Sequence, residues 1–213
     1  GRRVFINAGP TVEPIDPVRY ISNYSSGRMG IAIADMAARL GADVTLVLGP
    51  VTVLPQEKSV TVVPVKTAAE MKEASVKAFG VCEIAILAAA VADFTPETPS
   101  ATKVKRGDDD LVIRLKPTDD IAACLGKMKR TGQFLAGFAL ETDNEMENAM
   151  GKLRRKNLDM IILNSLKDQG AGFGYDTNRV TIIDRNNNID KFELKSKDEV
   201  ASDILEKIIS LTR

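Results

Sequence analysis

Hydroxyl and glycine residues follow the first apolar run of the chain in a pattern that could bind an anion. Ser25, Ser26, Gly27 and Gly30 lie at the start of a segment with helical periodicity. The N-terminus of a helix offers free backbone N–H groups and the positive end of the helix dipole, and both favour a phosphate or carboxylate. A serine N-cap with packing glycines is the ordinary alternative. The stretch that begins at Gly9 is, however, far longer than capping requires.

Lysines occur at two places with spacings that could bind the same kind of anion. Lys103, Lys105 and Arg106 form a dense cationic stretch, in which Lys103 and Lys105 would point the same way if the loop is extended. Lys152 and Lys156 are four residues apart, so their ammonium groups would lie on one face of a helix. A solvated charged surface is the simpler interpretation of both pairs.

Two further residues could contact a ligand. Asp93 follows the small residues Ala88, Ala89 and Ala90, where a carboxylate could accept hydrogen bonds or hold a divalent ion. A turn or helix cap would explain Asp93 equally well. Phe138 lies in an apolar run, where a core position is the alternative to stacking on a ligand.

The composition excludes several classes of protein. The 213 residues contain no histidine, which removes Ser-His-Asp hydrolases and histidine-ligated metal enzymes. The 29 Lys and Arg residues balance 29 Asp and Glu residues, so we expect neither nucleic acid nor a membrane surface as the main partner. The two cysteines have no metal-binding or disulfide spacing, and we therefore expect a reducing, cytoplasmic setting. No apolar run reaches the roughly 18 residues needed to span a bilayer.

Short apolar runs alternate with amphipathic segments, which predicts an α/β, Rossmann-like fold with a mostly parallel sheet and helices on both faces. We expect one domain over 1–213, with a mobile basic loop over 94–107 and a C-terminal β-hairpin. Ligands of such sheets bind beyond the carboxyl ends of the strands. The expected strands cover 4–8, 44–48, 60–65, 83–90, 111–115, 134–139 and 160–163, with hairpin strands at 180–183 and 191–194. The expected helices cover 29–40, 68–78, 119–129 and 143–156, and a capping box at Ser196 and Glu199 opens the last one.

Standard cofactor motifs are missing from this pattern. The first strand is not followed by G-x-G-x-x-G, and G-x-x-x-x-G-K-[ST] does not occur. No tyrosine is followed four residues later by lysine, as short-chain reductases would require. An NAD(P)-dependent reductase on a Rossmann-like sheet is therefore a weaker interpretation, and a non-catalytic nucleotide-binding partner of a flavoprotein is another.

Several motifs in order resemble the phosphopantothenoylcysteine synthetase family. They are Gly9-Pro-Thr-x-Glu-Pro-x-Asp16, Arg19 to Gly30, Ala89-Ala-Val-Ala-Asp93, Lys103-x-Lys105-Arg106, Gly137-Phe-Ala-x-Glu-Thr142, Lys152-x3-Lys156 and Gly172-Phe-x-x-Asp-x-Asn178. The resemblance implies a ligase of coenzyme A biosynthesis. Bacterial members are often fused to a flavin-dependent decarboxylase that precedes this domain, so FMN is not expected here.

The resemblance also implies the reaction. CTP with Mg²⁺ would activate the carboxylate of 4′-phosphopantothenate to an acyl-cytidylate, and L-cysteine would then form the amide, releasing CMP after pyrophosphate. Eukaryotic members use ATP, which is the nearest alternative. Lys103 would stabilise charge on the triphosphate, and Asn23 would stabilise the oxyanion of the second step. Such chemistry needs no histidine.

The remaining roles are carried over from matching motif positions, and metal ligands are not indicated. Residues resembling nucleotide contacts are Gly9, Ser25, Gly27, Gly30, Leu87, Ala88, Ala89, Asp93, Lys103, Thr118, Asp119, Asp120, Ile121, Phe138, Lys152, Lys156 and Asn164. Residues resembling contacts to phosphopantothenate are Arg19, Asn23, Ala89, Ala90 and Asp93. Arg19 would reach from a neighbouring subunit, which implies a homodimer with shared active sites. The sequence departs from the bacterial pattern at Thr118-Asp-Asp-Ile121, where we would expect Asn-Pro-Asp-Ile.

Overall fold

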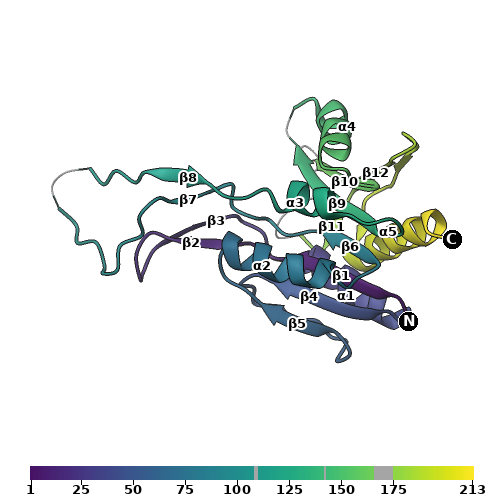
Figure 1. The fold of residues 1–213 in the computed structure, drawn as a ribbon, viewed down its shortest axis with the longest axis horizontal. Helices are drawn as coiled ribbons and strands as arrows, with labels where there is room; N and C mark the ends of the chain where they lie inside the picture. Colours follow the sequence, from purple (N-terminus) through teal and green to yellow (C-terminus); the bar gives the residue numbers. More distant parts are fainter. Residues whose placement is uncertain (108–109, 142, 166–174) are drawn as a thin grey trace.

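A twisted eight-stranded sheet forms the centre of the computed structural model, which describes residues 1–107, 110–141, 143–165 and 175–213 (Figure 1). The strand order is β13-β12-β10-β9-β6-β1-β4-β5. The six strands from β10 to β5 in this list are parallel to one another. Strands β12 and β13 are antiparallel to their neighbours. The strands are β1 (Arg3–Ala8), β4 (Asp43–Leu48), β5 (Thr61–Pro64), β6 (Ile84–Leu87), β9 (Phe134–Glu141), β10 (Met160–Ser165), β12 (Val180–Asp184) and β13 (Ile189–Lys191).

Helices cover both faces of this sheet, as the sequence predicts. One face packs against α1 (Arg28–Arg39) and α5 (Lys197–Leu211), and the other packs against α2 (Ala68–Phe79), α3 (Ile121–Met128) and α4 (Glu145–Arg155). Side chains alternate between the two cores, because Ile6 of β1 faces α1 and its neighbour Phe5 faces the opposite helices. Both are fully buried, which explains why the central strands are near-continuous apolar runs.

The helix starts are partly as predicted. Ser196 caps α5 in a capping box with Glu199, and Thr67 with Glu70 does the same for α2. The N-cap of α1 is Gly27, with a left-handed φ of 72° and no side-chain cap, so the serine N-cap alternative is wrong. The helix predicted over 29–40 ends one residue earlier, at Arg39, and Leu40 is 58% exposed.

A long two-stranded arm extends from the body beside a short hairpin (Figure 1). The hairpin pairs β2 (Val12–Pro14) with β3 (Tyr20–Ser22), and the arm pairs β7 (Phe94–Pro96) with β8 (Leu115–Pro117). The expected loop over 94–107 therefore begins with a strand, and the expected strand over 111–115 is wrong except at its last residue. Residues 111–114 belong to no strand, although the Arg114 carbonyl accepts the Glu97 N–H at 2.9 Å, and Leu111 and Val112 are exposed.

Two other boundaries differ from the prediction. The expected strand over 83–90 ends at Leu87, and beyond it the chain stays beside the residues that follow β1, with one parallel bridge between Ala90 and Pro10. The predicted C-terminal hairpin is confirmed in β12 and β13, but its second strand covers Ile189–Lys191, so the predicted strand over 191–194 is wrong except at Lys191. A short pair, β11 (Thr177–Asn178) with β14 (Lys195–Ser196), has no counterpart in the prediction.

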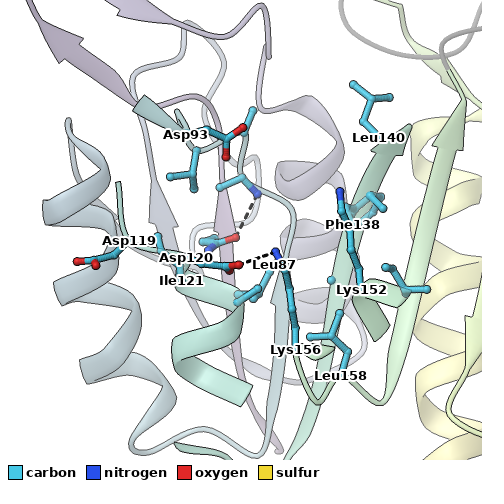
Figure 2. A pocket seen from close by; sticks show the side chains of 18 of the residues that line it. Leu87, Asp93, Asp119, Asp120, Ile121, Phe138, Leu140, Lys152, Lys156 and Leu158 are labelled. Carbon is cyan, nitrogen blue, oxygen red and sulfur yellow. Dashed lines mark hydrogen bonds and ion pairs between the residues drawn. The ribbon is translucent and has the colours of Figure 1, made fainter. Parts of the chain in front are cut away.

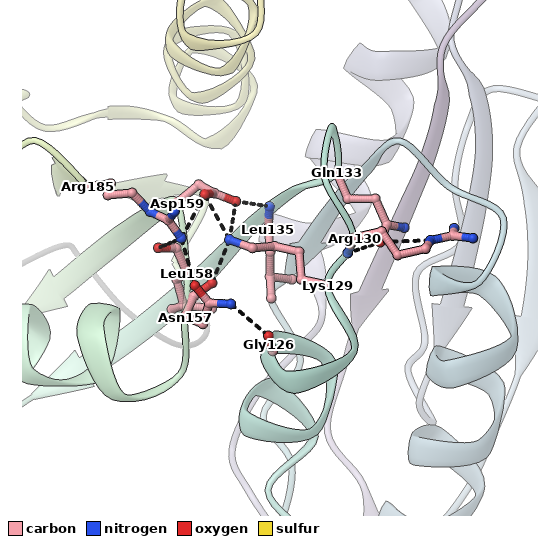
Figure 3. Close-up of polar contacts among 9 residues, drawn as sticks. All are labelled: Gly126, Lys129, Arg130, Gln133, Leu135, Asn157, Leu158, Asp159 and Arg185. Atoms are coloured by element: carbon pink, nitrogen blue, oxygen red, sulfur yellow. Dashed lines mark hydrogen bonds and ion pairs between the residues drawn. The ribbon is translucent and has the colours of Figure 1, made fainter.

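The amino edge of the parallel strands is held by a buried cation (Figure 3). Lys129 Nζ lies 2.9 Å from both carboxylate oxygens of Asp159 and donates to the carbonyl of Asn157 at 2.7 Å. Asp159 also accepts from the Leu135 N–H and pairs with Arg185 at 3.1 Å. Every charge is partnered, so this cluster connects α3, β9, β10 and the end of β12 at the edge opposite the polar crevice described below.

None of the helices in the described parts of the chain combines the length and the apolar character that crossing a bilayer needs.

Candidate active site

The strand order defines one place where a ligand would bind. From β1 the chain moves to β4 and β5 on one side and then returns to β6 on the other side. Such a change of direction leaves a crevice at the carboxyl ends of the two central strands. Two adjoining cavities lie there, and both are lined by Ala89, Ala90 and Phe138. We name them the lysine cavity, of about 350 Å³, and the glycine cavity, of about 240 Å³.

The lysine cavity contains both predicted lysines of α4. Lys152 Nζ lies 2.6 Å from Glu141 at the end of β9, and Lys156 Nζ lies 3.0 Å from Asp120, the N-cap of α3. Figure 2 shows both amino groups pointing into the cavity. Burial of Asp120 opposes its ionisation, but the Ala123 N–H and the Lys156 ammonium outweigh it and lower the pKa of this carboxyl. Without a ligand, each lysine is therefore neutralised by a carboxylate that a phosphate could replace.

The other wall of the lysine cavity comes from the segments after β6 and before α3. Leu87, Ala89, Ala90, Asp93, Thr118, Asp119 and Ile121 line it. Thr118 connects the two segments, because its hydroxyl donates to the Ala92 carbonyl at 2.6 Å and its N–H donates to the Asp93 carbonyl at 2.9 Å. Asp119 is exposed and paired with Lys72 of α2 at 2.8 Å. Apart from Ala88, which lines the glycine cavity, the predicted contacts in these segments therefore share one cavity.

The glycine cavity is built around the start of α1. Ser25, Gly27, Gly30, Ala88 and Asn164 line it, as the sequence predicts. A Cβ at Gly30 would lie 2.4 Å from the Cβ of Ala8, so only glycine lets α1 approach β1 this closely. Gly9 lines neither cavity; it packs under Gly27, where a Cβ would lie 3.2 Å from the Gly9 Cα. Gly9 thus supports the cavity through packing.

Asn23 lies where the two cavities meet. Its side-chain amide donates to the Ala90 carbonyl at 2.9 Å, and Ala90 lines both cavities. One N–H of the Asn23 amide is used by this bond, and the amide has a second donor. Phe138 is half-buried and lines both cavities while also packing on the core, so the core and ligand interpretations hold together.

Two predicted residues are not brought to the crevice. Lys103 is exposed on the arm and lines neither cavity of this chain. Arg19 lies at the turn of the β2–β3 hairpin, where its guanidinium pairs with Asp16 and donates to the Val104 carbonyl. Thr142 and Gly172, which belong to two of the family motifs, lie outside the described residues.

Several polar residues at the crevice were missed as candidates. Asn7 is buried in β1 and accepts from the Ala89 N–H at 3.1 Å, which anchors the segment after β6. The sequence does mark Asn7 as a candidate, because it is a polar residue in an otherwise apolar strand. Asn178, buried beside the glycine cavity, donates to Asn164 at 3.3 Å. Glu141 had a signal, because it is the glutamate of the motif Gly137-Phe-Ala-x-Glu-Thr142, but no role was assigned to it.

Fold and site together define a Rossmann-like α/β domain with a polar crevice at the switch point of its sheet. The chain belongs to the family described as the DNA/pantothenate metabolism flavoprotein C-terminal domain, whose model matches residues 1–211.

Relatives of this chain carry two kinds of name. One relative is a cysteine/cysteine sulfinic acid decarboxylase from an unknown prokaryotic organism, to which the chain is 71% identical. The match covers 99% of this chain and 59% of that relative. Another relative is the coenzyme A biosynthesis bifunctional protein CoaBC of Bacillus subtilis (strain 168), to which the chain is 44% identical. That match covers the full length of this chain and 52% of the relative. The chain therefore spans between half and three fifths of these two relatives.

A solved structure has the same fold as this chain over nearly the whole length of both. The crystal structure of the C-terminal domain of the coenzyme A biosynthesis bifunctional protein CoaBC has a TM-score of 0.84 and 42% sequence identity, covering 99% of this chain and 95% of that one. The chain is thus homologous to the C-terminal domain of these bifunctional proteins, and the expected Rossmann-like α/β class is confirmed.

Proposed function

We propose that this chain is a ligase domain that joins 4′-phosphopantothenate to L-cysteine, with CTP as co-substrate. Its support is the homology to coenzyme A biosynthesis proteins together with the crevice. The observation that carries the proposal is that Lys152, Lys156 and Asn23, from distant parts of the chain, border adjoining cavities at the switch point of the sheet.

The first step would use the lysine cavity. A carboxylate oxygen of phosphopantothenate attacks the α-phosphorus of the nucleotide, and the bond to pyrophosphate breaks. Lys152 and Lys156 exchange Glu141 and Asp120 for phosphate oxygens and stabilise the charge that develops on pyrophosphate. Because the ammonium groups are already held in place by ion pairs, little reorganisation accompanies that exchange.

The second step would use the junction of the cavities. The amine of L-cysteine attacks the acyl carbonyl and forms a tetrahedral oxyanion, which collapses as the C–O bond to CMP breaks and the nitrogen releases a proton to solvent. The second N–H of the Asn23 amide donates to that oxyanion, since the Ala90 carbonyl holds the first.

Magnesium would enter with the nucleotide as part of the substrate. In the described ranges, no three acidic or cysteine side chains are grouped closely enough to hold a metal ion. Mg²⁺ typically keeps phosphate and water ligands and needs only one or two carboxylates. Asp93 and Asp120 line the lysine cavity and fit that role.

We propose that two copies of the chain form a homodimer through the arm and the β2–β3 hairpin. Tyr20, Phe94, Leu111 and Val112 are exposed there, with 87% of Val112 accessible. Exposed apolar groups on neighbouring segments are typical of a contact surface. A second copy on this surface would bring Lys103 or Arg19 toward a crevice that neither reaches in its own chain. In the complete protein, we propose that this single domain is fused to or associated with a flavin-dependent decarboxylase.

The most informative assay is pyrophosphate release from CTP and from ATP in the presence of Mg²⁺ and phosphopantothenate. We expect release with CTP, several-fold faster than with ATP, and amide formation once L-cysteine is added. No phosphopantothenate-dependent release with either nucleotide would contradict the ligase proposal.

The name of the 71% identical relative supports a second candidate, decarboxylation of cysteine or cysteine sulfinic acid. About two fifths of that relative lies outside the match, so the named activity need not reside in this part. Measuring CO₂ release from both amino acids without nucleotide separates the candidates, because the ligase proposal expects none from this chain. A nicotinamide-dependent reductase would instead be revealed by NADPH oxidation.

Asn23→Asp tests the role of the amide. We expect pyrophosphate release within a few-fold of wild type but a loss of amide formation of about 10²-fold or more, because a carboxylate cannot donate to an oxyanion. The acyl-cytidylate should accumulate and be detectable by mass spectrometry. A wild-type rate of amide formation would remove Asn23 from the mechanism.

A further inference from the structure

Asp16 and Arg19 hold the backbone of one arm residue from both sides. The Val104 N–H donates to Asp16 Oδ2 at 3.1 Å, and the Val104 carbonyl accepts from Arg19 Nη2 at 2.5 Å. The two side chains also bind each other, with Arg19 Nε and Nη2 at 3.0 and 2.5 Å from Asp16 Oδ2. We name this arrangement the clasp.

On the hairpin side of the clasp, several hydrogen bonds hold the Asp16 side chain in place. The side chain of Asp16 is fully buried and accepts the N–H groups of Val18 and Arg19 at 2.8 and 2.9 Å, which form the turn between β2 and β3. Burial opposes ionisation, but these hydrogen bonds and those from Arg19 and Val104 outweigh it and hold the pKa of Asp16 well below its usual range. A buried carboxylate with five donors is the fixed half of the clasp.

The arm is the half that is held. Arm residue Ser100 donates its N–H to the Ile15 carbonyl at 2.9 Å, so the segment from 100 to 104 lies along the hairpin. Val104 is flanked by Lys103 and Lys105, whose side chains are exposed. Holding both polar groups of the Val104 backbone therefore sets where these two lysines project.

We propose that Asp16 and Arg19 are positioning residues for the arm, and that they fix the point from which Lys103 acts on the nucleotide. The catalytic part of this inference rests on the proposed ligase function, whereas the grip on Val104 does not. Asp16 has no exposed side-chain surface and cannot touch substrate, so any effect of its replacement on the reaction must act through other groups.

The grip is tested by hydrogen–deuterium exchange of the segment 100–105 in Asp16→Asn. In Asp16→Asn, an NH₂ group replaces one of the carboxylate oxygens that accept hydrogen bonds, so the grip on Val104 is weakened. We therefore expect the amides of the segment to exchange about tenfold faster, while those of β1 and β4 exchange as in wild type. Val104→Pro is a second variant that removes the Val104 donor and fixes the φ of that residue, while it leaves the side chains of Asp16 and Arg19 unchanged. Arg114→Gln is the matched control, because Arg114 is an exposed arm arginine whose side chain lies 3.9 Å from Glu97 and, among the described residues, donates to no arm backbone.

The consequence for catalysis is tested in the background of Lys103→Gln. If the clasp acts through Lys103, Asp16→Asn lowers kcat for pyrophosphate release about tenfold in the wild-type chain and adds no further loss to Lys103→Gln. Equal losses in both backgrounds would show a role in general folding and overturn the proposal. Unchanged exchange of 100–105 in both clasp variants would also overturn it. If the wild-type chain releases no pyrophosphate, the ligase proposal fails while the exchange measurement still decides the grip.

Discussion

At the scale of residues, ion pairs in the lysine cavity keep two cations ready for an anion. Lys156 is about a quarter exposed and Asp120 about half exposed, so their pair contributes little to the free energy of unfolding. Its importance is positional, because the pair holds an ammonium group where a phosphate oxygen would bind.

Lys156→Gln should therefore weaken nucleotide binding without unfolding the protein. We expect the KM for CTP to rise at least tenfold, with a melting temperature within a few degrees of wild type. Lys77→Gln is the control, since Lys77 forms a similar ion pair with Glu73 at 2.7 Å on an exposed helix face. Equal KM values for the two variants would show that Lys156 does not contact the nucleotide.

Gly30 contributes through its lack of a side chain, which lets α1 pack closely against β1. Gly30→Ala places a Cβ 2.4 Å from the Cβ of Ala8, and we expect a loss of about 1–3 kcal/mol in the free energy of unfolding. Adding Ala8→Gly removes the clashing atom and should recover most of that loss in chemical denaturation. If the single variant is as stable as wild type, α1 and β1 are not packed as tightly as described.

At the scale of elements, α5 shows how local sequence sets a boundary. Its capping box satisfies backbone donors at the first turn, and its apolar face packs on α1. The site depends on this indirectly, because α1 carries Gly27 and Gly30.

Ser196→Ala should lower the free energy of unfolding by about 1 kcal/mol, since the Glu199 N–H loses its acceptor. Ser202→Ala on the same helix is the control, because Ser202 donates only to exposed Glu206 at 3.2 Å. Equal urea midpoints for the two variants would contradict a stabilising cap.

At the scale of the whole molecule, two buried carboxylates make the stability of the fold depend on pH in the acid range. Burial opposes ionisation of Asp16 and Asp184, but hydrogen bonds outweigh it, and the pKa of each is lowered in the folded state. A lowered folded pKa gives stability that is complete above the unfolded value of about 3.9 and is lost as the pH falls through the folded value. Without histidine, no imidazole titrates between pH 5 and 8.

We therefore expect the melting temperature to be nearly constant from pH 5 to 7 and to fall steeply below about pH 4. Asp16→Asn should be less stable than wild type at pH 7 and should show a shallower fall in acid, because one depressed carboxyl is gone. Calorimetry across pH 2–7 measures both slopes. Parallel curves would mean that Asp16 does not contribute to acid unfolding.

Much of the sequence-based prediction of elements is confirmed because the central strands are buried on both faces. Apolar runs such as Ile84–Leu87 and Phe134–Ala139 cannot be exposed segments, and the predicted capping box at Ser196 marks the start of α5. The arm was the least predictable part, because Leu111, Val112 and Ile113 form an apolar run, yet Leu111 and Val112 are exposed. Their pattern implies a buried face that this chain alone does not provide.

The sequence by itself determined the fold class, the family resemblance and most residues of the crevice, since apolar periodicity and ordered motifs are local properties of the chain. Only the tertiary structure decided which residues meet. Strand order joins Asn23, Phe138 and Lys152 at one edge, packing makes Gly9 a support, and the clasp holds Arg19 against Val104. These are contacts between residues far apart in sequence, and they depend on the crossover of the chain at β1, which no local pattern encodes.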